Sequence, residues 1–203
     1  MLYVIIGVIA AYFLGSIPTG YIFGKVLKKI DIRECGSGNV GATNTFRSVG
    51  KIPGIIVLVI DFLKGYVAVT VLPMFVQQFF TERDLSAEYI FILFGAAAIS
   101  GHIWTVFLNF KGGKGVATTA GVMAGLAPLI LLLSFVCWLV IFVIFRYVSL
   151  ASIIAAITLP FFAVIFQKSI MFVLFASILC IVGVYKHRAN IKRLFNGEEK
   201  RLL

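Results

Sequence analysis

Five long apolar runs dominate this sequence, and each can cross a lipid bilayer as a helix, for which about 20 residues suffice. These runs are Leu2–Gly24, Ile52–Val76, Tyr89–Leu108, Val148–Phe166 and Ser169–Tyr185. Apolar residue types make up 61% of the 203 residues and charged types only 13%, with a mean hydropathy of +1.08. A chain of this size has too much surface to be covered by so few charges. The sequence therefore predicts an all-α integral membrane protein and excludes a soluble domain, a disordered tail and a disulfide scaffold.

The uncharged stretch from Gly115 to Phe145 is too long for one ordinary span. As a single helix it would be about 45 Å long, against a hydrocarbon core of ~30 Å. Pro128 offers a break, and two short helices over 115–127 and 129–146 would fit if they pack against neighbours. Together with the five runs, this break predicts a seven-transmembrane-helix bundle with some short or broken helices.

The distribution of basic residues gives the orientation of these spans. With seven spans and an outside N-terminus, every Lys and Arg falls on an inner loop or the C-terminal tail, except Lys64, Arg83 and Lys168. Six spans would put the basic tail opposite the basic 25–51 loop, against the positive-inside rule. We therefore expect the N-terminus outside and the C-terminus in the cytoplasm. The net charge of +10 then reflects topology and anionic ligands, and no nucleic acid is expected as a partner.

The first of three polar, glycine-containing segments reads GSGNVGATN over residues 36–44, and Arg47 follows it. It matches G-x-G-x-x-G formally, but a dinucleotide site needs a βαβ unit, which this chain does not offer. Glycines let backbone N–H groups approach an anion, and a following helix start adds favourable partial charge. A flexible turn between spans is the alternative. The candidate anion-binding residues of this first motif are Gly36, Ser37, Gly38, Asn39, Thr43, Asn44 and Arg47.

The second motif reads GHIWTVFLNFKGGKGVAT over residues 101–118. Leu108 stands where a Walker A loop needs its first glycine and Gly115 where it needs Ser or Thr, so nucleotide hydrolysis is excluded. Lys-Gly-Gly-Lys-Gly before a short helix nevertheless offers open backbone amides, a helix N-terminus and a lysine charge for a phosphate. Lys114 is predicted to function there, whereas anchoring at the membrane boundary is the simpler role of Lys111. The candidate phosphate contacts are Lys111, Gly112, Gly113, Lys114 and Gly115.

The third motif reads HRANIKRLFNGEE over residues 187–199, at the inner end of the last span. A spacing of three places His187 and Asn190 on one helix face, and neither residue is needed for topology. A basic tail that binds anionic lipid is the alternative, and it suits Arg193 and the residues beyond. Ser149, at the inner turn before the sixth span, could join the same polar pocket.

Other polar groups within the membrane have simpler explanations. Asp61 and Lys64 are three residues apart and most simply neutralise each other. His102 is a possible site residue or a satisfied structural histidine. With two histidines on separate segments and three cysteines without C-x-x-C spacing, we expect no metal site and no disulfide.

Some acyl-transfer chemistries are absent from the sequence. The H-x-x-x-x-D pair of many glycerolipid acyltransferases is missing, since Phe107 stands five residues after His102 and Lys192 five residues after His187. The multiple-aspartate motif of CDP-alcohol phosphotransferases is missing as well. The candidate site thus gathers cations and amides without paired carboxylates, which favours phosphate binding over hydrolysis by a general base.

The three motifs together resemble those of the bacterial acyl-phosphate-dependent glycerol-3-phosphate acyltransferases of the integral membrane type. The resemblance covers essentially the whole chain, so residues 1–203 are expected to form a single transmembrane domain without a cofactor. It implies acyl transfer from acyl phosphate to the sn-1 hydroxyl of glycerol 3-phosphate, at the cytoplasmic face of the bacterial inner membrane. The resemblance places in the active site Ser37, Arg47, Lys114, Ser149, His187 and Asn190, with the glycine loops on phosphates and Arg188 among the substrate contacts.

Within this resemblance we expect direct attack of the glycerol hydroxyl on the acyl carbonyl, because acyl phosphate is already activated. Lys114 would stabilise the departing phosphate and Arg47 would hold the glycerol phosphate. The proton would pass to His187 or to the phosphate of the donor, and the lack of a carboxylate favours the phosphate. A small transporter for phosphate or a phosphorylated metabolite is the alternative function, and a noncatalytic scaffold is a third. The sequence leaves the oligomeric state open and is compatible with a monomer.

Overall fold

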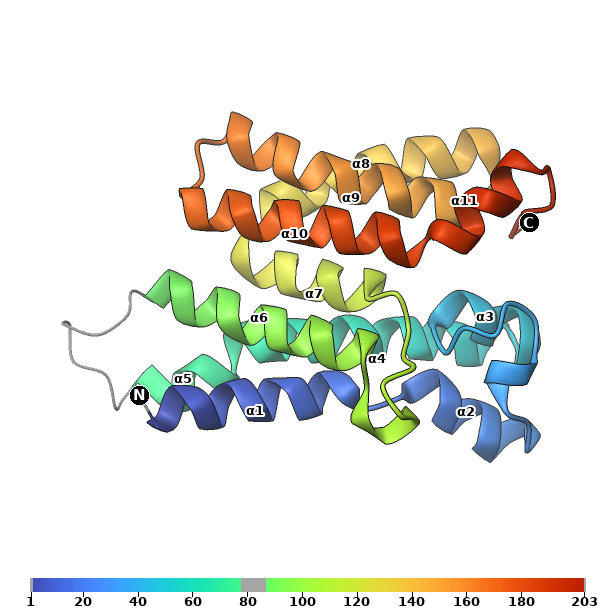
Figure 1. Ribbon diagram of the computed structural model, residues 1–203, viewed down its shortest axis with the longest axis horizontal. Helices are drawn as coiled ribbons and strands as arrows, with labels where there is room; N and C mark the ends of the chain where they lie inside the picture. The colour runs from blue at the N-terminus through green and yellow to red at the C-terminus, as the bar shows by residue number, and fades with distance from the viewer. Residues whose placement is uncertain (1, 78–86, 203) are drawn as a thin grey trace. The chain divides into compact units, whose positions relative to one another are not determined.

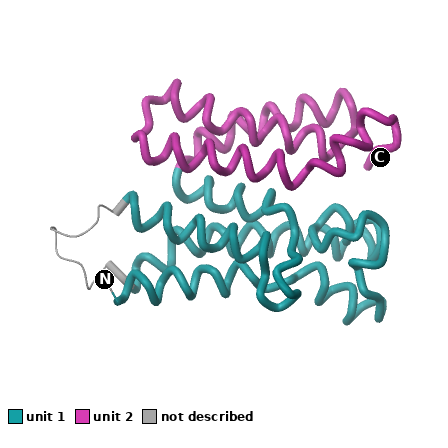
Figure 2. The backbone as a smooth tube through the Cα atoms, viewed as in Figure 1, with its two compact units in different colours: residues 1–126 teal, residues 127–203 magenta. Residues whose placement is uncertain are grey.

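The computed structural model describes residues 2–77 and 87–202, and every regular element within them is a helix, as predicted (Figure 1). Arg83, expected on an outer loop, lies outside the described residues. The chain divides into two compact units, Met1–Leu126 and Ala127–Leu203 (Figure 2). The first unit contains α1 (Leu2–Ser16), α2 (Thr19–Lys28), η1 (Ile32–Glu34), α3 (Ala42–Ser48), α4 (Lys51–Thr70), α5 (Leu72–Gln77), α6 (Ala87–Ile103), η2 (Val106–Leu108) and α7 (Val116–Leu126). The second unit contains α8 (Pro128–Phe145), α9 (Val148–Ile165), α10 (Ile170–Lys186) and α11 (Arg188–Phe195).

The break predicted near Pro128 is confirmed. Helix α7 ends at Leu126, Ala127 takes a non-helical conformation, and Pro128 is the first residue of α8. Proline suits this position because its missing N–H would have no partner at a helix start.

A second break falls where the sequence predicted one continuous span over Leu2–Gly24. Helix α1 ends at Ser16 and α2 begins at Thr19, with Pro18 between them. Pro18 has no N–H to donate to the preceding turn, so the helical hydrogen-bond ladder stops there. The run still qualifies as one membrane-crossing segment, Leu2–Lys28, but it consists of two helices, and the break introduces polar backbone into an otherwise apolar segment.

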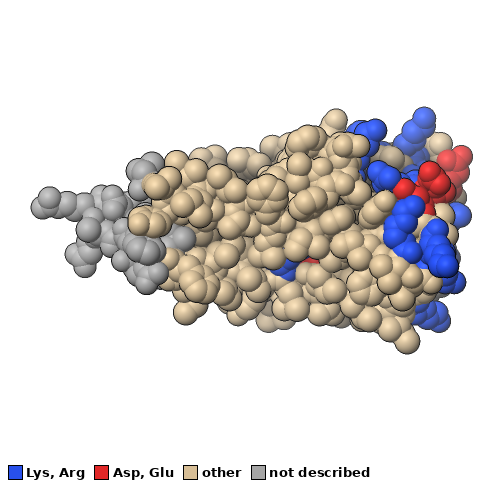
Figure 3. Space-filling view, turned by 90° about the horizontal axis from the view of Figure 1, so that it is seen from below, with Lys and Arg blue, Asp and Glu red and all other residues tan. Residues whose placement is uncertain are grey.

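By length and composition, five helical segments of the described chain can cross a membrane, or six if the bent pair α10 and α11 counts as one span. These five segments are Leu2–Lys28, Lys51–Phe75, Glu88–Leu108, Pro128–Phe145 and Val148–Ile165. Helix α7 is apolar but has only 11 residues, fewer than a bilayer requires. Large apolar side chains such as Val26 and Ile170 are more than 70% exposed, and most of the face drawn in Figure 3 is uncharged. The structure is that of an all-helical membrane protein.

Helix α7 is held in the first unit by close backbone contact with α4. A Cβ on Gly65 of α4 would collide with the carbonyl oxygen of Thr118 in α7, and a Cβ on Gly121 of α7 would collide with that of Phe62 in α4. Small residues let membrane helices approach to this extent, and packing then replaces the hydrophobic driving force available in water. The reciprocal glycine contacts explain how a helix of 11 residues keeps a fixed position.

We predict that Gly65→Val lowers the free energy of unfolding by about 3 kcal/mol, because the new side chain meets backbone that cannot move aside. Thermal unfolding of the purified protein in detergent measures this loss. Gly183→Ala in α10 is the matched control, since a Cβ there makes only ordinary contact with Ala156. Equal melting temperatures for the two variants would contradict the close-contact interpretation.

Candidate active site

The first motif is organised around the side chain of Asn44, which is only 2% exposed. Its Nδ2 donates to the carbonyl oxygens of Ile32, Cys35 and Asn39 at 3.1, 3.0 and 2.9 Å. Its Oδ1 accepts the backbone N–H of Ser37 at 3.0 Å. One neutral amide thus ties the loop to η1 and to α3, and this explains why the residue is Asn: the position needs both donors and an acceptor.

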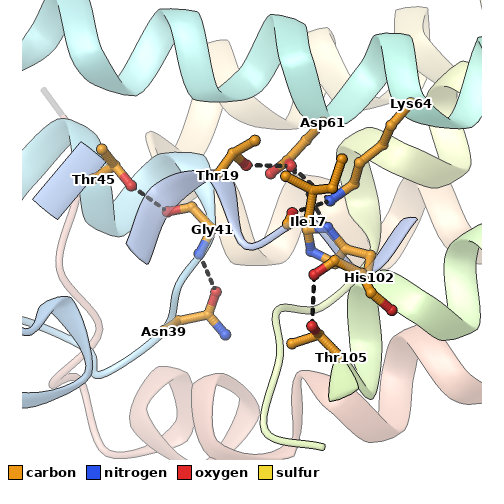
Figure 4. Close-up of polar contacts among 10 residues, drawn as sticks. Ile17, Thr19, Asn39, Gly41, Thr45, Asp61, Lys64, His102 and Thr105 are labelled. Carbon is orange, nitrogen blue, oxygen red and sulfur yellow. Dashed lines mark hydrogen bonds and ion pairs between the residues drawn. The ribbon is translucent and has the colours of Figure 1, made fainter. Parts of the chain in front are cut away.

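Several backbone amides of the first motif are therefore used within the loop. The N–H of Gly38 donates to Cys35 at 3.0 Å, and that of Gly41 donates to the Asn39 side chain at 2.9 Å (Figure 4). Gly36 has a φ of +60°, which permits the turn that brings the chain back to Asn44. The side chains of Ser37 and Arg47 are exposed. The anion contacts of this motif stay a prediction, which concerns these two side chains and the start of α3, where Thr43 lies half-buried.

We predict that Asn44→Asp destabilises the protein by on the order of 3 kcal/mol, because an acceptor oxygen would then face three carbonyl oxygens. The variant has nearly the same shape and keeps the acceptor for Ser37, so the loss reports the missing donor together with the added negative charge at a buried position. Asn39→Asp is the control, since the Asn39 side chain accepts from Gly41 and a carboxylate can do the same. Melting temperatures in detergent compare the two, and a greater loss for Asn39→Asp would contradict the prediction.

The second motif folds back onto the end of α6. The N–H groups of Gly112 and Gly113 donate to the carbonyl oxygens of Ile103 and His102 at 3.1 and 3.0 Å. The expectation of open amides is therefore wrong at these two positions, because α6 ends there and its last carbonyls need donors. Gly113 also lies directly against the His102 ring, where a Cβ would collide with Nε2. Because both N–H groups are already bonded, Gly112 and Gly113 can serve the predicted phosphate site only by leaving room for the anion, since they carry no side chain.

The two lysines of the second motif differ in their surroundings. Lys114 is half-buried and lies two residues before the start of α7, whereas Lys111 is exposed. Gly115 is buried, with a φ of +84°, so it turns the chain from the loop into the helix. The functional role of Lys114 and the boundary role of Lys111 stay predictions.

Asp61 and Lys64 form the ion pair that the sequence predicted, at 2.9 Å and with both side chains buried. They are also part of a larger network at the α1–α2 break (Figure 4). The Asp61 carboxylate accepts from the Thr19 hydroxyl at 2.6 Å and lies 3.7 Å from His102 Nδ1. Lys64 donates to the Ile17 carbonyl at 3.2 Å. The sequence missed Thr19, and Pro18 in the middle of an apolar run was the available signal.

His187 of the third motif is 3% exposed and its Nδ1 lies 2.8 Å from the Gly183 carbonyl oxygen. A carbonyl can only accept, so Nδ1 carries the hydrogen and Nε2 is the acceptor nitrogen of the neutral ring. The residue stands at the junction of α10 and α11, where the chain bends by 55°. His187 is the N-cap of α11 and its carbonyl accepts the Ile191 N–H at 2.9 Å, so it stands in the same helical turn as Asn190, and both side chains are buried.

Glu199 contacts Ser149 and Asn190, two residues that the sequence predicted to share one polar pocket. Its Oε1 accepts from the Ser149 hydroxyl and from Asn190 Nδ2, each at 2.7 Å. Its Oε2 accepts from Arg193 Nε at 2.7 Å. Sequence reasoning assigned no carboxylate to the site, and an acidic residue within a strongly basic tail was the signal. Ser149 and Asn190 are thus brought together, with a carboxylate between them.

The environment of Glu199 keeps it ionised. Burial alone would raise the pKa of its carboxyl, but hydrogen bonds from Ser149, Arg193 and Asn190 outweigh burial and hold the pKa below its usual value. A carboxylate that accepts several hydrogen bonds is stabilised in its charged form. Glu199 therefore serves as an acceptor that positions Ser149 and Asn190, and its own basicity is low. Arg188, predicted as a substrate contact, is exposed and stacks on Tyr185 with 4.4 Å between its guanidinium carbon and the ring centroid.

The comparisons with known proteins cover nearly the full chain. Residues 5–197 match a family model described as glycerol-3-phosphate acyltransferase. The curated glycerol-3-phosphate acyltransferase 2 of Moorella thermoacetica is 44% identical over 198 residues, which are 98% of this chain and 97% of that protein. The corresponding protein of Staphylococcus haemolyticus is 41% identical over 202 residues, 98% of each chain.

Solved structures agree with this result. The crystal structure of PlsY, an integral membrane glycerol 3-phosphate acyltransferase, in its glycerol 3-phosphate form has a TM-score of 0.87 and 41% identity, covering 98% of this chain and 94% of that one. The lysophosphatidic acid form has a TM-score of 0.84 and 40% identity, with the same coverage.

Proposed function

This chain belongs to the glycerol-3-phosphate acyltransferase family, and on that premise we propose that its acyl donor is an acyl phosphate. The chain is an integral membrane enzyme that acylates glycerol 3-phosphate. The observation that carries the proposal is that the family match runs from residue 5 to residue 197 and includes most or all of each motif. The related PlsY structures are named as glycerol 3-phosphate and lysophosphatidic acid forms, which supports these molecules as substrate and product here. Membership in an enzyme family replaces the transporter alternative.

The proposed reaction is one displacement at the acyl carbon. The sn-1 hydroxyl oxygen of glycerol 3-phosphate bonds to the carbonyl carbon, and the bond from that carbon to the phosphate oxygen breaks. Inorganic phosphate leaves with the bonding electrons, and the hydroxyl proton is transferred to a base. Lys114 stabilises the charge on the departing phosphate, and Arg47 holds the phosphate of the acceptor. Orientation and charge stabilisation suffice because the donor is already activated.

We propose the phosphate of the donor as the proton acceptor, with His187 Nε2 orienting the hydroxyl. Glu199, the carboxylate beside Ser149 and Asn190, is occupied by three donors and is a poor base. His187→Gln is then expected to reduce turnover by less than about 10²-fold, the smallest loss typical of removing a general base. A larger loss, together with disappearance of the histidine limb from the pH–rate profile, would assign the proton to His187.

We further propose that residues 1–203 act as one acyltransferase domain with seven spans, in which α7 provides the short extra crossing. The N-terminus would lie outside, and the three motifs would face the cytoplasm from the inner membrane of a bacterium. The positive-inside distribution of Lys and Arg supports this orientation. Cysteine-accessibility labelling at the C-terminal tail of intact cells tests it, and labelling from outside would contradict it.

The decisive experiment supplies the purified protein in detergent with glycerol 3-phosphate and one acyl donor at a time. Acyl phosphate is expected to give lysophosphatidic acid and phosphate, whereas acyl-CoA and acyl carrier protein are expected to give no product. A Lys114→Met sample serves as the control for uncatalysed acyl transfer. Product from acyl-CoA alone would overturn the assignment of the donor.

A further inference from the structure

The buried network around Asp61 has no role in the proposed reaction, yet it connects three parts of the first unit. It begins at the α1–α2 break, where the carbonyl groups of Ser16 and Ile17 no longer belong to a continuous helix. The Thr105 hydroxyl donates to Ser16 at 2.5 Å, and Lys64 donates to Ile17 at 3.2 Å. Within a membrane such carbonyls need internal donors, so this part of the network is explained by the break itself.

The remaining contacts are not needed for the break. The Asp61 carboxylate is 1% exposed and its Oδ1 is shared by Thr19, Lys64 and His102, at 2.6, 2.9 and 3.7 Å. A buried ion pair loses much of its hydration, and well-packed apolar residues often stabilise a fold equally well. The stability gained by burying side chains therefore does not by itself explain why this position holds an ion pair.

His102, itself part of the second motif, is the member of the network that contacts the Lys111–Gly115 loop. One edge of its ring faces Asp61, and Nε2 lies against Gly113 so closely that no side chain would fit. The His102 carbonyl also accepts the Gly113 N–H at 3.0 Å. Lys114, the proposed phosphate-binding lysine, is the next residue. A small cavity at the same place is lined by Asp61, Lys64, His102 and by Val40 of the first motif.

We propose that Thr19, Asp61, Lys64 and His102 form a positioning network that fixes the Lys111–Gly115 loop and thereby sets the place of Lys114. The four side chains are at most 8% exposed, so they act through the loop and do not contact substrate. That the Lys111–Gly115 loop binds phosphate rests on the proposed function. That the network holds this loop in place rests on the contacts of His102 with Gly113 alone. The two claims are therefore measured separately.

The first measurement is hydrogen–deuterium exchange of the full-length protein in detergent, read in peptides that cover residues 108–118. His102→Phe keeps a ring of similar size and removes the nitrogens, and the charge-balanced double variant Asp61→Asn/Lys64→Met removes the ion pair. In both variants, amide exchange at Gly112 and Gly113 is expected to accelerate about tenfold or more, because weakening one hydrogen bond changes the local opening equilibrium by about that factor. Thr70→Val is the matched control, because the Thr70 hydroxyl bonds within α4, to the Tyr66 carbonyl at 2.7 Å. Unchanged exchange in the folded variants would overturn the proposal.

The second measurement is the KM for each substrate, which does not depend on how much enzyme is folded. Lys114→Arg is expected to raise the KM of one of the two substrates. We expect the network variants to raise the KM of that same substrate by about tenfold. Thr19→Val, which removes one hydroxyl and no charge, gives a smaller rise and serves if the other variants fail to fold. A kcat loss with both KM values unchanged would indicate a merely structural role and overturn the positioning claim. Faster exchange at Gly113 in the network variants, with no KM change in either Lys114→Arg or Lys114→Met, would support the network and refute the phosphate role of the loop.

Discussion

Lys114→Met is expected to lower kcat/KM for lysophosphatidic acid formation by about 10²-fold or more, the usual cost of removing one group that stabilises transition-state charge. Lys114 is half-buried beside the start of α7, so its charge acts where screening by water is reduced. Methionine keeps the length of the side chain and removes only the ammonium group. Initial rates with acyl phosphate and glycerol 3-phosphate, measured over both concentrations, give the loss.

Lys51→Met is the matched control, because Lys51 is an exposed lysine at the first turn of α4 and belongs to none of the motifs. It is expected to keep full activity. Lys111→Met separates the two roles that the sequence left open for that residue: a boundary anchor changes insertion into the membrane, whereas a phosphate contact changes KM. Full activity of Lys114→Met would contradict the proposed mechanism at its central step.

Glu199→Ala is expected to destabilise the α9–α11 end of the second unit, where Ser149 and Asn190 lie, by about 2–4 kcal/mol and to abolish most of the activity. The substitution leaves the Ser149 hydroxyl, Asn190 Nδ2 and Arg193 without their shared acceptor, and unsatisfied buried donors cost about 1–3 kcal/mol each. Since Ser149 and Asn190 are predicted site residues, their displacement lowers turnover as well. Thermal unfolding and the acyl-transfer rate are measured on the same preparation.

The neighbouring Glu198 provides the control. Its side chain is exposed, so Glu198→Ala is expected to leave both measurements nearly unchanged. Glu199→Gln keeps an acceptor oxygen for Ser149 and Asn190 but loses the charge opposite Arg193, and its effects should fall between the two. If Glu198→Ala and Glu199→Ala behaved alike, the carboxylate would have no organising role.

The lowered pKa of Glu199 also gives a pH dependence of definite sign. A carboxyl group with a lowered pKa in the folded state stabilises that state fully above its unfolded-state pKa of about 4.3. This stabilisation is lost as the pH falls through the lower folded-state value. The melting temperature of the wild type should therefore fall more steeply below about pH 4 than that of Glu199→Gln.

Much of the fold could be predicted from the sequence because hydrophobic length and proline act locally. The apolar runs became helices, the long uncharged stretch broke at Pro128, and Asp61 paired with Lys64, each for a reason contained within one segment. The helix count in the membrane was less accessible, since α7 is too short to meet a length criterion and is held by glycine contacts with α4.

The parts of the site that could not be predicted depend on contacts between distant segments. Whether the Gly112 and Gly113 amides are open depends on where α6 ends, and they proved to be bonded to its last carbonyls. Glu199 lies 50 residues from Ser149 along the chain, and no local pattern connects the two. Thr19 became part of a network because α1 ends at Ser16 and α2 begins at Thr19, with Pro18 between them.

The way Asn44 holds the first motif has a consequence for how this enzyme can be altered. The loop owes its shape to hydrogen bonds between backbone groups and one uncharged side chain, so neither acidity nor salt should deform it. The outward side chains, such as Ser37, contribute little to that shape. They can therefore be substituted while the scaffold of the loop stays intact.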